Sequence, residues 1–196
     1  QTCALPIYGP AETEVGGVIP NMIAHSDKRI AVGHPDAMAE LRAVRAEPTP
    51  AGGGYANDRE AFSFRAITYR MPEVYCTTGH NLPRAERKRP YNPVLINPDD
   101  LAAHGFSDGE CVLIDSGFGQ VEGILEESDE VASGTLGIAH GWGDPMDERP
   151  VEEKGTNVQL LIPGDSRYDP ITGLAQQSAY PVNLHKLEGR IIARSA

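Results

Sequence analysis

The residues best suited to chemistry in this sequence are polar side chains in one loop, together with a few partners farther along the chain. The loop carries, in order, Arg70, Thr77, Thr78, Gly79, His80 and Asn81. The guanidinium of Arg70 can pair with a phosphate or a carbonyl in a planar fork. Gly79 permits close approach of the backbone, and Asn157 can donate and accept hydrogen bonds at once. These residue types suit contacts to a polar or anionic ligand.

Each of these residues also has a purely structural interpretation. Arg70 could be an exposed charge at the end of a strand. Asn81 and Asn157 could be turn residues, because asparagine side chains bond their own backbone in turns. His140 and Trp142, which stand close together in the sequence, could form a packed corner. The residue types alone do not choose between these interpretations.

Two other patterns suggest metal or protease chemistry. His80 could be a structural hydrogen-bonding residue, and with Cys76 it would supply only two metal ligands, too few for a site. The turn Asp115-Ser116-Gly117 is similar to the active-site turn of aspartic proteases, which need two such carboxylates sharing a proton. The sequence has one Asp-Ser-Gly, so a dimer would be required. Phe118 also stands where those proteases prefer a small residue.

The composition limits the function classes that the chain can serve. It has 196 residues, enough for one domain with a sizeable core, and a formal charge of −11. The charge and the pI of about 4.9 argue against binding to nucleic acid or to anionic membrane surfaces. No apolar run could span a bilayer and no signal peptide is recognisable. We expect a cytoplasmic or periplasmic protein without membrane insertion.

The basic cluster and the cysteines have plain interpretations. The cluster comprises Arg84, Arg87, Lys88 and Arg89. We favour a solvated loop for it, with an anion-facing loop near a diphosphate as the alternative. The three cysteines form no spaced pair, so a disulfide framework is not expected. Cys111 lies in an apolar strand and is expected to be a buried small hydrophobe.

The first residues of the chain, Gln1–Ile7, are what the codons CAG-ACG-TGT-GCT-CTT-CCG-ATC encode. This DNA is the end of a common short-read sequencing adaptor. We expect residues 1–7 to be read-through rather than native protein, and the true start of the protein to lie upstream. Recovery of the same codons from intact genomic DNA would overturn this expectation.

Residues 8–60 are predicted to form a connector with one helix and a glycine-rich linker. Pro35 and Asp36 suit the first turn of a helix. An apolar stripe at helical spacing follows, formed by Met38, Leu41 and Val44. Pro48 ends the pattern, and the stretch Thr49–Asp58, with three consecutive glycines, is the expected linker.

Residues 61–190 are predicted to form a mainly β domain with short helices. Strands are expected at Phe64–Tyr69, Val94–Ile96, Cys111–Ile114, Gln120–Leu125, Gly134–Ala139 and Tyr180–Leu184. A short helix should begin at Pro98, with Asn97 as its cap, and end at Gly105. Loops are expected at Arg70–Arg89 and Asp144–Gly155. Many short strands separated by Gly and Asp turns indicate a small closed barrel.

Four sequence blocks strengthen this interpretation through their order and spacing. They are Thr68-Tyr69-Arg70 with His80-Asn81-Leu82-Pro83, Asn97–Ser116, His140-Gly141-Trp142-Gly143, and Gly155-Thr156-Asn157-Val158 with Asp169-Pro170-Ile171-Thr172-Gly173. Together they resemble the C-terminal molybdopterin guanine dinucleotide-binding domain of the DMSO reductase superfamily of molybdopterin oxidoreductases. The resemblance covers most of the chain and implies a double-psi β-barrel, the aspartate decarboxylase-like fold.

The resemblance implies that the chain holds one end of a molybdenum, or tungsten, bis-(molybdopterin guanine dinucleotide) cofactor. The contacts expected from it are Arg70, Thr77, Thr78, Gly79, His80, Asn81, His140, Trp142, Asn157, Gln177 and Ser178. The loops Arg70–Pro83, His140–Gly143 and Gly155–Asn157 should form the rim of one concave surface. The resemblance assigns no catalytic or metal-ligating residue to this chain.

The same resemblance places the metal ligand, and any iron–sulfur cluster, in upstream domains of the same subunit. Those domains and an electron-transfer subunit are the partners that it implies, and the fragment alone is expected to be catalytically silent. A stand-alone barrel that binds proteins or ligands is the alternative. It would not need a gathering of polar residues on one side, namely Arg70, His80, Asn81 and Asn157. A pyruvoyl decarboxylase shares the fold but cleaves itself at a Gly-Ser bond, which this sequence lacks.

Overall fold

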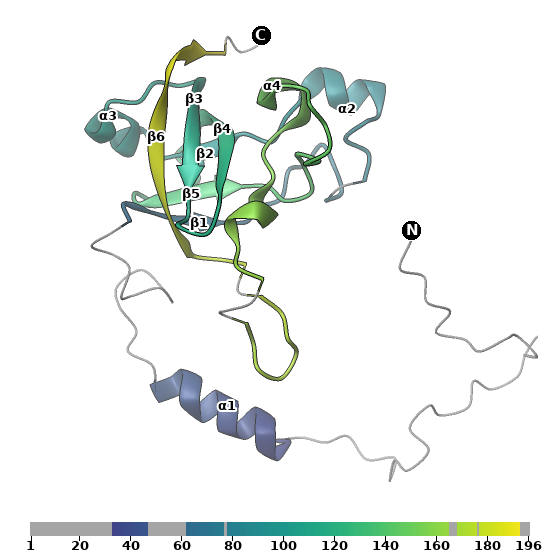
Figure 1. Cartoon of the computed structure of the whole chain (residues 1–196), viewed down its shortest axis with the longest axis vertical. Coiled ribbons are helices and arrows are strands. Elements are labelled where there is room, and N and C mark those ends of the chain that lie inside the picture. Colours follow the sequence, from purple (N-terminus) through teal and green to yellow (C-terminus); the bar gives the residue numbers. More distant parts are fainter. Residues whose placement is uncertain (1–32, 47–61, 77, 165–167, 176, 193–196) are drawn as a thin grey trace, which may run out of the picture.

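Six strands close into a barrel that carries the candidate residues on its connecting loops (Figure 1). The computed structural model describes residues 33–46, 62–76, 78–164, 168–175 and 177–192. Within them the strands are β1 (Phe64–Ile67), β2 (Val94–Ile96), β3 (Glu110–Asp115), β4 (Gln120–Glu127), β5 (Thr135–Ile138) and β6 (Tyr180–Ile191). Their order around the barrel is β1-β5-β2-β4-β3-β6. The chain therefore crosses over rather than meandering from neighbour to neighbour.

Two of the six strand pairings are parallel. They are β1 with β5 and β2 with β4, and the other four pairings are antiparallel. A mainly β fold with a closed barrel and short helices confirms the predicted double-psi class. Parallel neighbours need long connections, and the connections of this barrel supply the loops that line the candidate site.

The barrel interior is filled by side chains two residues apart, or four apart where Gly123 intervenes in β4, as alternation along a strand requires. The inward residues are Phe64 and Ala66, Val94 and Ile96, Val112 and Ile114, Val121 and Leu125, Leu136 and Ile138, and Tyr180 and Val182. All are at least nine-tenths buried. Cys111 is buried as predicted, on the opposite face of β3, and burial raises the pKa of its thiol.

The predicted short helix is confirmed as α3 (Pro98–His104). The Asn97 side chain accepts a hydrogen bond from the Asp99 amide at 3.0 Å, and Gly105 ends the helix with a φ of 69°. Asp100 is buried and accepts from the Ser133 hydroxyl at 2.6 Å and from the Gly134 amide at 2.7 Å. These bonds tie α3 to the turn that precedes β5.

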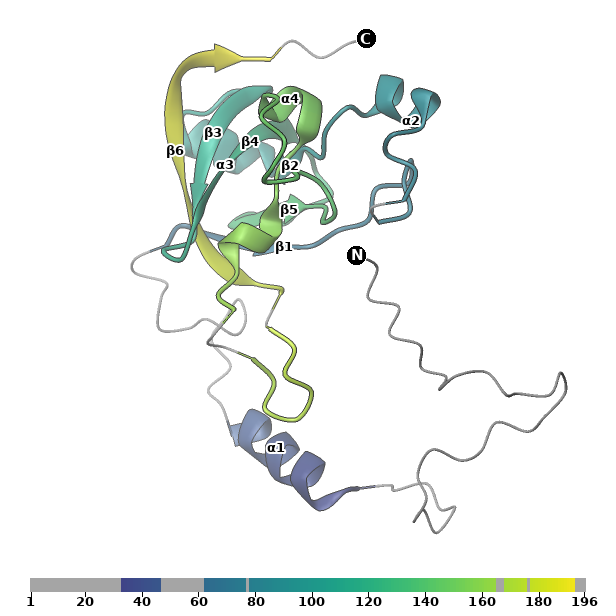
Figure 2. The ribbon, with the colours of Figure 1, turned by 45° about the vertical axis from the view of Figure 1, so that its right-hand side comes forward.

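The largest differences from the predicted elements concern the short helices and the last strand. The Arg70–Arg89 loop contains α2 (Pro83–Lys88), and the Asp144–Gly155 loop contains α4 (Val151–Lys154). The strand β6 runs on to Ile191 rather than ending at Leu184, because it pairs first with β1 and then with β3. A further short helix, η2 (Val158–Leu161), follows α4. Figures 1 and 2 both show α2 and α4 near each other on one side of the barrel.

The predicted N-terminal helix is confirmed as α1 (Pro35–Ala46), but its apolar stripe is not buried. No residue of α1 is buried, and Leu41 and Val44 are 59% and 51% exposed. Figures 1 and 2 draw α1 apart from the barrel. Residues 1–7 and the predicted linker lie outside the described residues, so the proposed domain boundaries stay predictions. No helix in the described ranges is long and apolar enough to cross a membrane.

Candidate functional site

A pocket of about 350 Å³ lies where the loop before α2 meets the segments on either side of α4. His80 and Asn81 line it from the loop before α2. Trp142 lines it from the segment before α4, and Asn157 from the segment after α4. Four predicted contact residues, separated widely in sequence, therefore share one concavity. Glu86 of α2 and Glu153 of α4 also line it, so both short helices contribute to the pocket.

The most unusual feature of this pocket is a pair of neighbouring rings that carry unpaired polar atoms. The rings of His80 and Trp142 lie 5.0 Å apart between centroids and are inclined by 31°. Trp142 is 7% exposed. Its Nε1 and the Nδ1 of His80 are buried without a hydrogen-bond partner among the described residues. Buried polar atoms are normally paired, so this pair fits a site whose hydrogen bonds are completed by a ligand.

Close backbone packing holds the Trp142 loop against the segment that leads to Asn157. The Gly143 amide donates to the Lys154 carbonyl at 2.9 Å. Gly143 has a φ of +70°, and a Cβ there would lie 2.6 Å from the Asn157 nitrogen. A side chain at position 143 would thus collide with backbone, and glycine is what allows the two segments to touch.

Asn157 combines a structural role with its place in the pocket. It caps η2, because its Oδ1 accepts a hydrogen bond from the Gln159 amide at 3.0 Å. The turn-residue interpretation therefore holds for this oxygen. The Nδ2 group of Asn157 remains a hydrogen-bond donor without an acceptor among the described residues. Sequence patterns could not separate these two uses of one side chain.

Arg70 and His140 lie in a separate, small hollow. Tyr69, Met71 and Cys76 line it with them, and it does not include the residues of the His80 pocket. The Nη1 of Arg70 donates to the Cys76 sulfur at 3.2 Å. The predicted single concave surface is therefore divided in two. Cys76 and His80 line different hollows, and among the described residues no group of three or more His, Cys, Asp or Glu side chains is placed to hold a metal ion.

The remaining predicted contacts lie outside the His80 pocket. Thr78 pairs with Tyr75 in a small bridge, and Gly79 follows it with a φ of +90°. Gln177 and Ser178 are exposed just before β6, where the Gln177 carbonyl accepts from the Thr68 hydroxyl at 3.5 Å. Thr77 lies outside the described residues.

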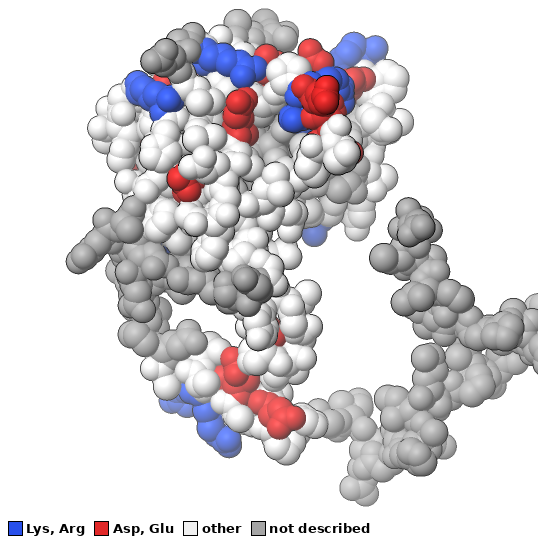
Figure 3. All heavy atoms as spheres, in the orientation of Figure 1, with Lys and Arg blue, Asp and Glu red and all other residues white. Residues whose placement is uncertain are grey.

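Charged residues that the sequence pattern did not single out crowd the α4 side of the pocket. Arg149 forms a fork with Asp147, with Nη2–Oδ2 and Nε–Oδ2 distances of 2.7 and 3.0 Å. The fork lowers the pKa of Asp147 to about 2 and raises that of Arg149. Lys154 donates to the Asp147 carbonyl at 2.6 Å. Figure 3 shows acidic and basic side chains intermixed over this part of the barrel.

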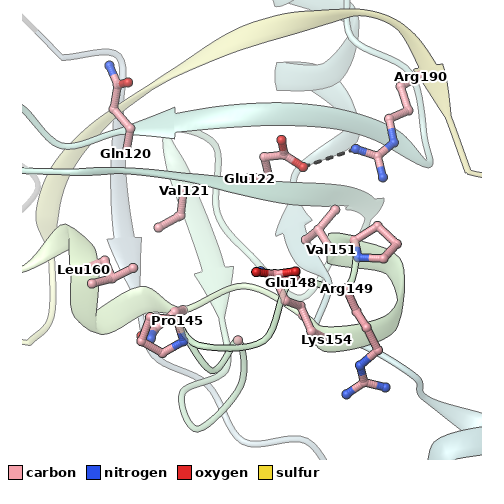
Figure 4. Close-up of a pocket in the computed structure, with 14 residues that line it drawn as sticks. Gln120, Val121, Glu122, Pro145, Glu148, Arg149, Val151, Lys154, Leu160 and Arg190 are labelled. Atoms are coloured by element: carbon pink, nitrogen blue, oxygen red, sulfur yellow. Dashed lines mark hydrogen bonds and ion pairs between the residues drawn. The ribbon is translucent and has the colours of Figure 1, made fainter.

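A second pocket, of about 500 Å³, shares part of its lining with the His80 pocket (Figure 4). The shared residues Arg149, Lys154 and Asn157 belong to one segment, which therefore borders both pockets. In the second pocket Arg190 lies beside Glu122, with an Nη1–Oε2 distance of 3.2 Å. Its cations are thus largely matched by protein carboxylates.

The basic cluster is partly neutralised by the protein itself. Lys88 lies 3.0 Å from Glu73, and Arg89 lies 3.8 Å from Glu73 and 2.9 Å from Glu126. These ion pairs lower the pKa of Glu73 and raise that of Arg89. Arg89 joins the end of α2 to β4 through Glu126, and both cations join it to Glu73 in the loop after β1. These contacts favour a structural role for Lys88 and Arg89.

The aspartic-protease pattern is a hairpin turn. The Asp115 carboxylate accepts from the Gly117 amide at 2.7 Å and from the Gln120 side chain at 2.8 Å. These bonds lower the pKa of Asp115, and Ser116 closes the same turn onto the Gly119 carbonyl. Both residues therefore shape the connection between β3 and β4.

The sequence belongs to a known family. Residues 64–179, more than half of the chain, match the family described as the molydopterin dinucleotide binding domain. The chain is therefore a member of that family, and its cofactor class is a molybdopterin. The matched span begins with β1 and includes every element that lines the His80 pocket.

Curated relatives are much longer than this chain. It is 27% identical over 175 residues to the trimethylamine-N-oxide reductase of Haemophilus influenzae, covering 83% of this chain and 20% of the relative. It is 39% identical over 87 residues to the dimethyl sulfoxide/trimethylamine N-oxide reductase of Rhodobacter capsulatus, covering 44% of this chain and 9% of the relative. The chain thus spans a fifth or less of these proteins.

A solved structure supports the fold. The acetylene hydratase from Pelobacter acetylenicus superposes with a TM-score of 0.60 and 17% sequence identity. The match covers 72% of this chain and 21% of that chain. At this identity, the similarity shows that the barrel is shared and carries no further conclusion about activity.

Proposed function

We propose that this chain binds one end of a molybdenum, or tungsten, bis-(molybdopterin guanine dinucleotide) cofactor as the C-terminal domain of a molybdopterin-dependent oxidoreductase. Family membership supports the cofactor class. The single observation that carries the assignment to this pocket is the pair of neighbouring His80 and Trp142 rings with their two buried, unpaired nitrogens. A pterin or purine edge offers the donors and acceptors that would pair with them.

The proposed contacts divide according to the two concavities. His80, Asn81, Trp142 and Asn157 would hold the ligand in the larger pocket, and Arg70 and His140 would act from the smaller hollow. Thr77, Thr78, Gly79, Gln177 and Ser178 remain proposed contacts from the surrounding loops. The two unpaired nitrogens are covered by protein, so a ligand would reach them when the loop carrying His80 moves aside.

The redox chemistry would be supplied by the bound cofactor, and this chain's residues would bind and orient it. The metal-ligating residue, and any iron–sulfur cluster, would come from upstream domains of the same subunit. The length of the relatives supports this division, since this chain spans a fifth or less of them. An electron-transfer subunit is a further proposed partner.

A binding measurement tests the proposal. The 196-residue chain is titrated by calorimetry with pterin guanine dinucleotide released from a molybdenum reductase and freed of metal. We expect saturable binding, weakened roughly five- to tenfold by Trp142→Phe, which removes one hydrogen-bond donor and keeps an aromatic ring. Tyr168→Phe, at an exposed position outside both pockets, is the matched control. Absence of binding, or equal affinity of Trp142→Phe, would defeat the site assignment.

A further inference from the structure

The Asn92 side chain, just before β2, is fully buried and bonds two separate chain segments. Its Nδ2 donates to the Ala139 carbonyl at 2.6 Å and to the Thr156 carbonyl at 3.0 Å. Its Oδ1 accepts from the Thr156 amide at 2.7 Å. Asn92 has no exposed surface. One amide thus satisfies three backbone groups that would otherwise be buried without partners.

Both segments lead directly into the candidate pocket. Ala139 stands three residues before Trp142, and Thr156 immediately precedes Asn157. Asn92 itself lines neither of the two pockets. Its bonds therefore act on the pocket through the backbone of the residues that line it.

Neighbouring contacts leave the two segments little freedom to shift. The Thr156 hydroxyl donates to the Glu122 carbonyl at 2.9 Å, which fixes the second segment to β4. A Cβ at Gly155 would lie 2.4 Å from the Asn92 Oδ1 and 3.0 Å from the Trp142 Cβ. Asn92, Gly155 and Trp142 are therefore packed against one another, and the amide sets the spacing between the Trp142 and Asn157 segments.

We propose that Asn92 is a positioning residue of the pocket, whose amide holds Trp142 and Asn157 in one arrangement. The positioning of the two segments follows from the hydrogen bonds of the Asn92 amide alone. Its consequence for cofactor binding rests on the proposed function. A residue that only stabilised the barrel would affect unfolding without moving Trp142 in the folded protein.

Asn97 offers a matched control for this distinction. It is also an asparagine that bonds two chain segments, donating to the Val131 carbonyl at 2.9 Å and accepting from the Asp99 amide at 3.0 Å. It lines neither pocket and serves α3. Asn97→Ala should therefore reproduce the loss of stability without the effect on the pocket.

The test compares Asn92→Ala with Asn97→Ala in the full 196-residue chain. Trp142 is the only tryptophan, so its emission and its quenching by acrylamide report on the pocket without ambiguity. We expect both variants to lower the melting temperature. Only Asn92→Ala should shift Trp142 emission to longer wavelength, raise the quenching constant severalfold and weaken binding of the released pterin dinucleotide at least tenfold.

Asn92→Asp keeps the shape and the bond from the Thr156 amide but loses both donated bonds, and it carries the test if Asn92→Ala does not fold. Folded Asn92 variants with an unchanged Trp142 signal, or an equal change in Asn97→Ala, would overturn the positioning role. If the wild-type chain binds no dinucleotide, the proposed function fails while the Trp142 comparison still decides the role of Asn92.

Discussion

At the scale of single residues, the pocket depends on side chains that have two uses. Asn157 caps η2 through Oδ1 and presents an amide donor in the pocket. Trp142 packs in a small cluster with Met71 and Ala139 while its Nε1 has no partner among the described residues. A protein that needed only packing would gain nothing from leaving a buried indole nitrogen unpaired, since such atoms cost about 1–3 kcal/mol.

The donor of Asn157 is expected to contribute to cofactor retention in the intact subunit. Asn157→Ala removes the donor and the helix cap together, and we expect retention to weaken by about 1–3 kcal/mol. Asn157→Asp keeps an oxygen that can cap η2 but lacks the donor. It should lose cofactor as readily as Asn157→Ala while melting near the wild-type temperature. The measurement is the pterin retained per subunit after gel filtration, and full retention by both variants would contradict the assignment.

The Asp147–Arg149 fork should make a pH-dependent contribution to stability. Arg149 holds the pKa of Asp147 at about 2, below its ordinary value of 3.8. A carboxyl whose pKa is lower in the folded state stabilises the fold above its unfolded pKa. The contribution is therefore present above pH 3.8 and is lost as the pH falls toward 2. Arg149→Ala should return the pKa of Asp147 toward 3.8 in a carboxyl-carbon NMR titration. An unmoved titration curve would contradict the fork.

At the scale of elements, local groups fix the ends of a short helix. The Asn97 side chain caps the start of α3, and Gly105 ends it. The Asn97 cap of α3 should contribute about 1 kcal/mol, as helix N-caps do. Asn97→Ala should lower the free energy of unfolding in urea by this amount for the cap, with a further loss from the bond to the Val131 carbonyl. Asn97→Asp, which keeps the cap acceptor, should recover most of the capping part. Equal unfolding midpoints for wild type and Asn97→Ala would argue against the cap.

Local signals predicted the elements whose causes are local. The apolar run Val94-Leu95-Ile96 located β2, and the sequence Asn97-Pro98 with Gly105 located α3 to the residue. The extension of β6 to Ile191 could not be predicted this way, because it follows from pairing with β3. The same applies to α2 and α4, whose polar sequences look like loops and whose positions are set by ion pairs such as that of Arg89 with Glu126.

The predicted contacts came from the family resemblance, and their role as contacts stays a prediction. The structure brings four of them, His80, Asn81, Trp142 and Asn157, into one pocket. Nothing in the sequence indicated that Arg70 would turn toward Cys76 and form a separate hollow with His140. Asn92 gave no signal either, since its importance lies in contacts to residues 47 and 64 positions away.

At the scale of the whole molecule, the barrel is a rigid frame that presents loops of mixed charge. The chain carries a formal charge of −11, and the His80 pocket is lined by the carboxylates Glu86, Asp144, Asp147 and Glu153 against the two cations Arg149 and Lys154. These carboxylates would oppose an anionic diphosphate, so its charge would have to be met by Arg149 and Lys154. Because α1 buries none of its residues within the described part of the chain, its apolar stripe contributes little to the barrel's stability.

We propose that a molybdopterin dinucleotide binds in the pocket of His80, Trp142 and Asn157. The most direct measurement follows the indole N–H resonance of Trp142 by nitrogen-15 NMR, because this single tryptophan gives one indole signal. We expect this indole resonance to shift downfield in a saturable manner as released pterin dinucleotide is added, because the unpaired Nε1 gains an acceptor. An indole resonance that stays in place while calorimetry shows the dinucleotide bound would contradict it.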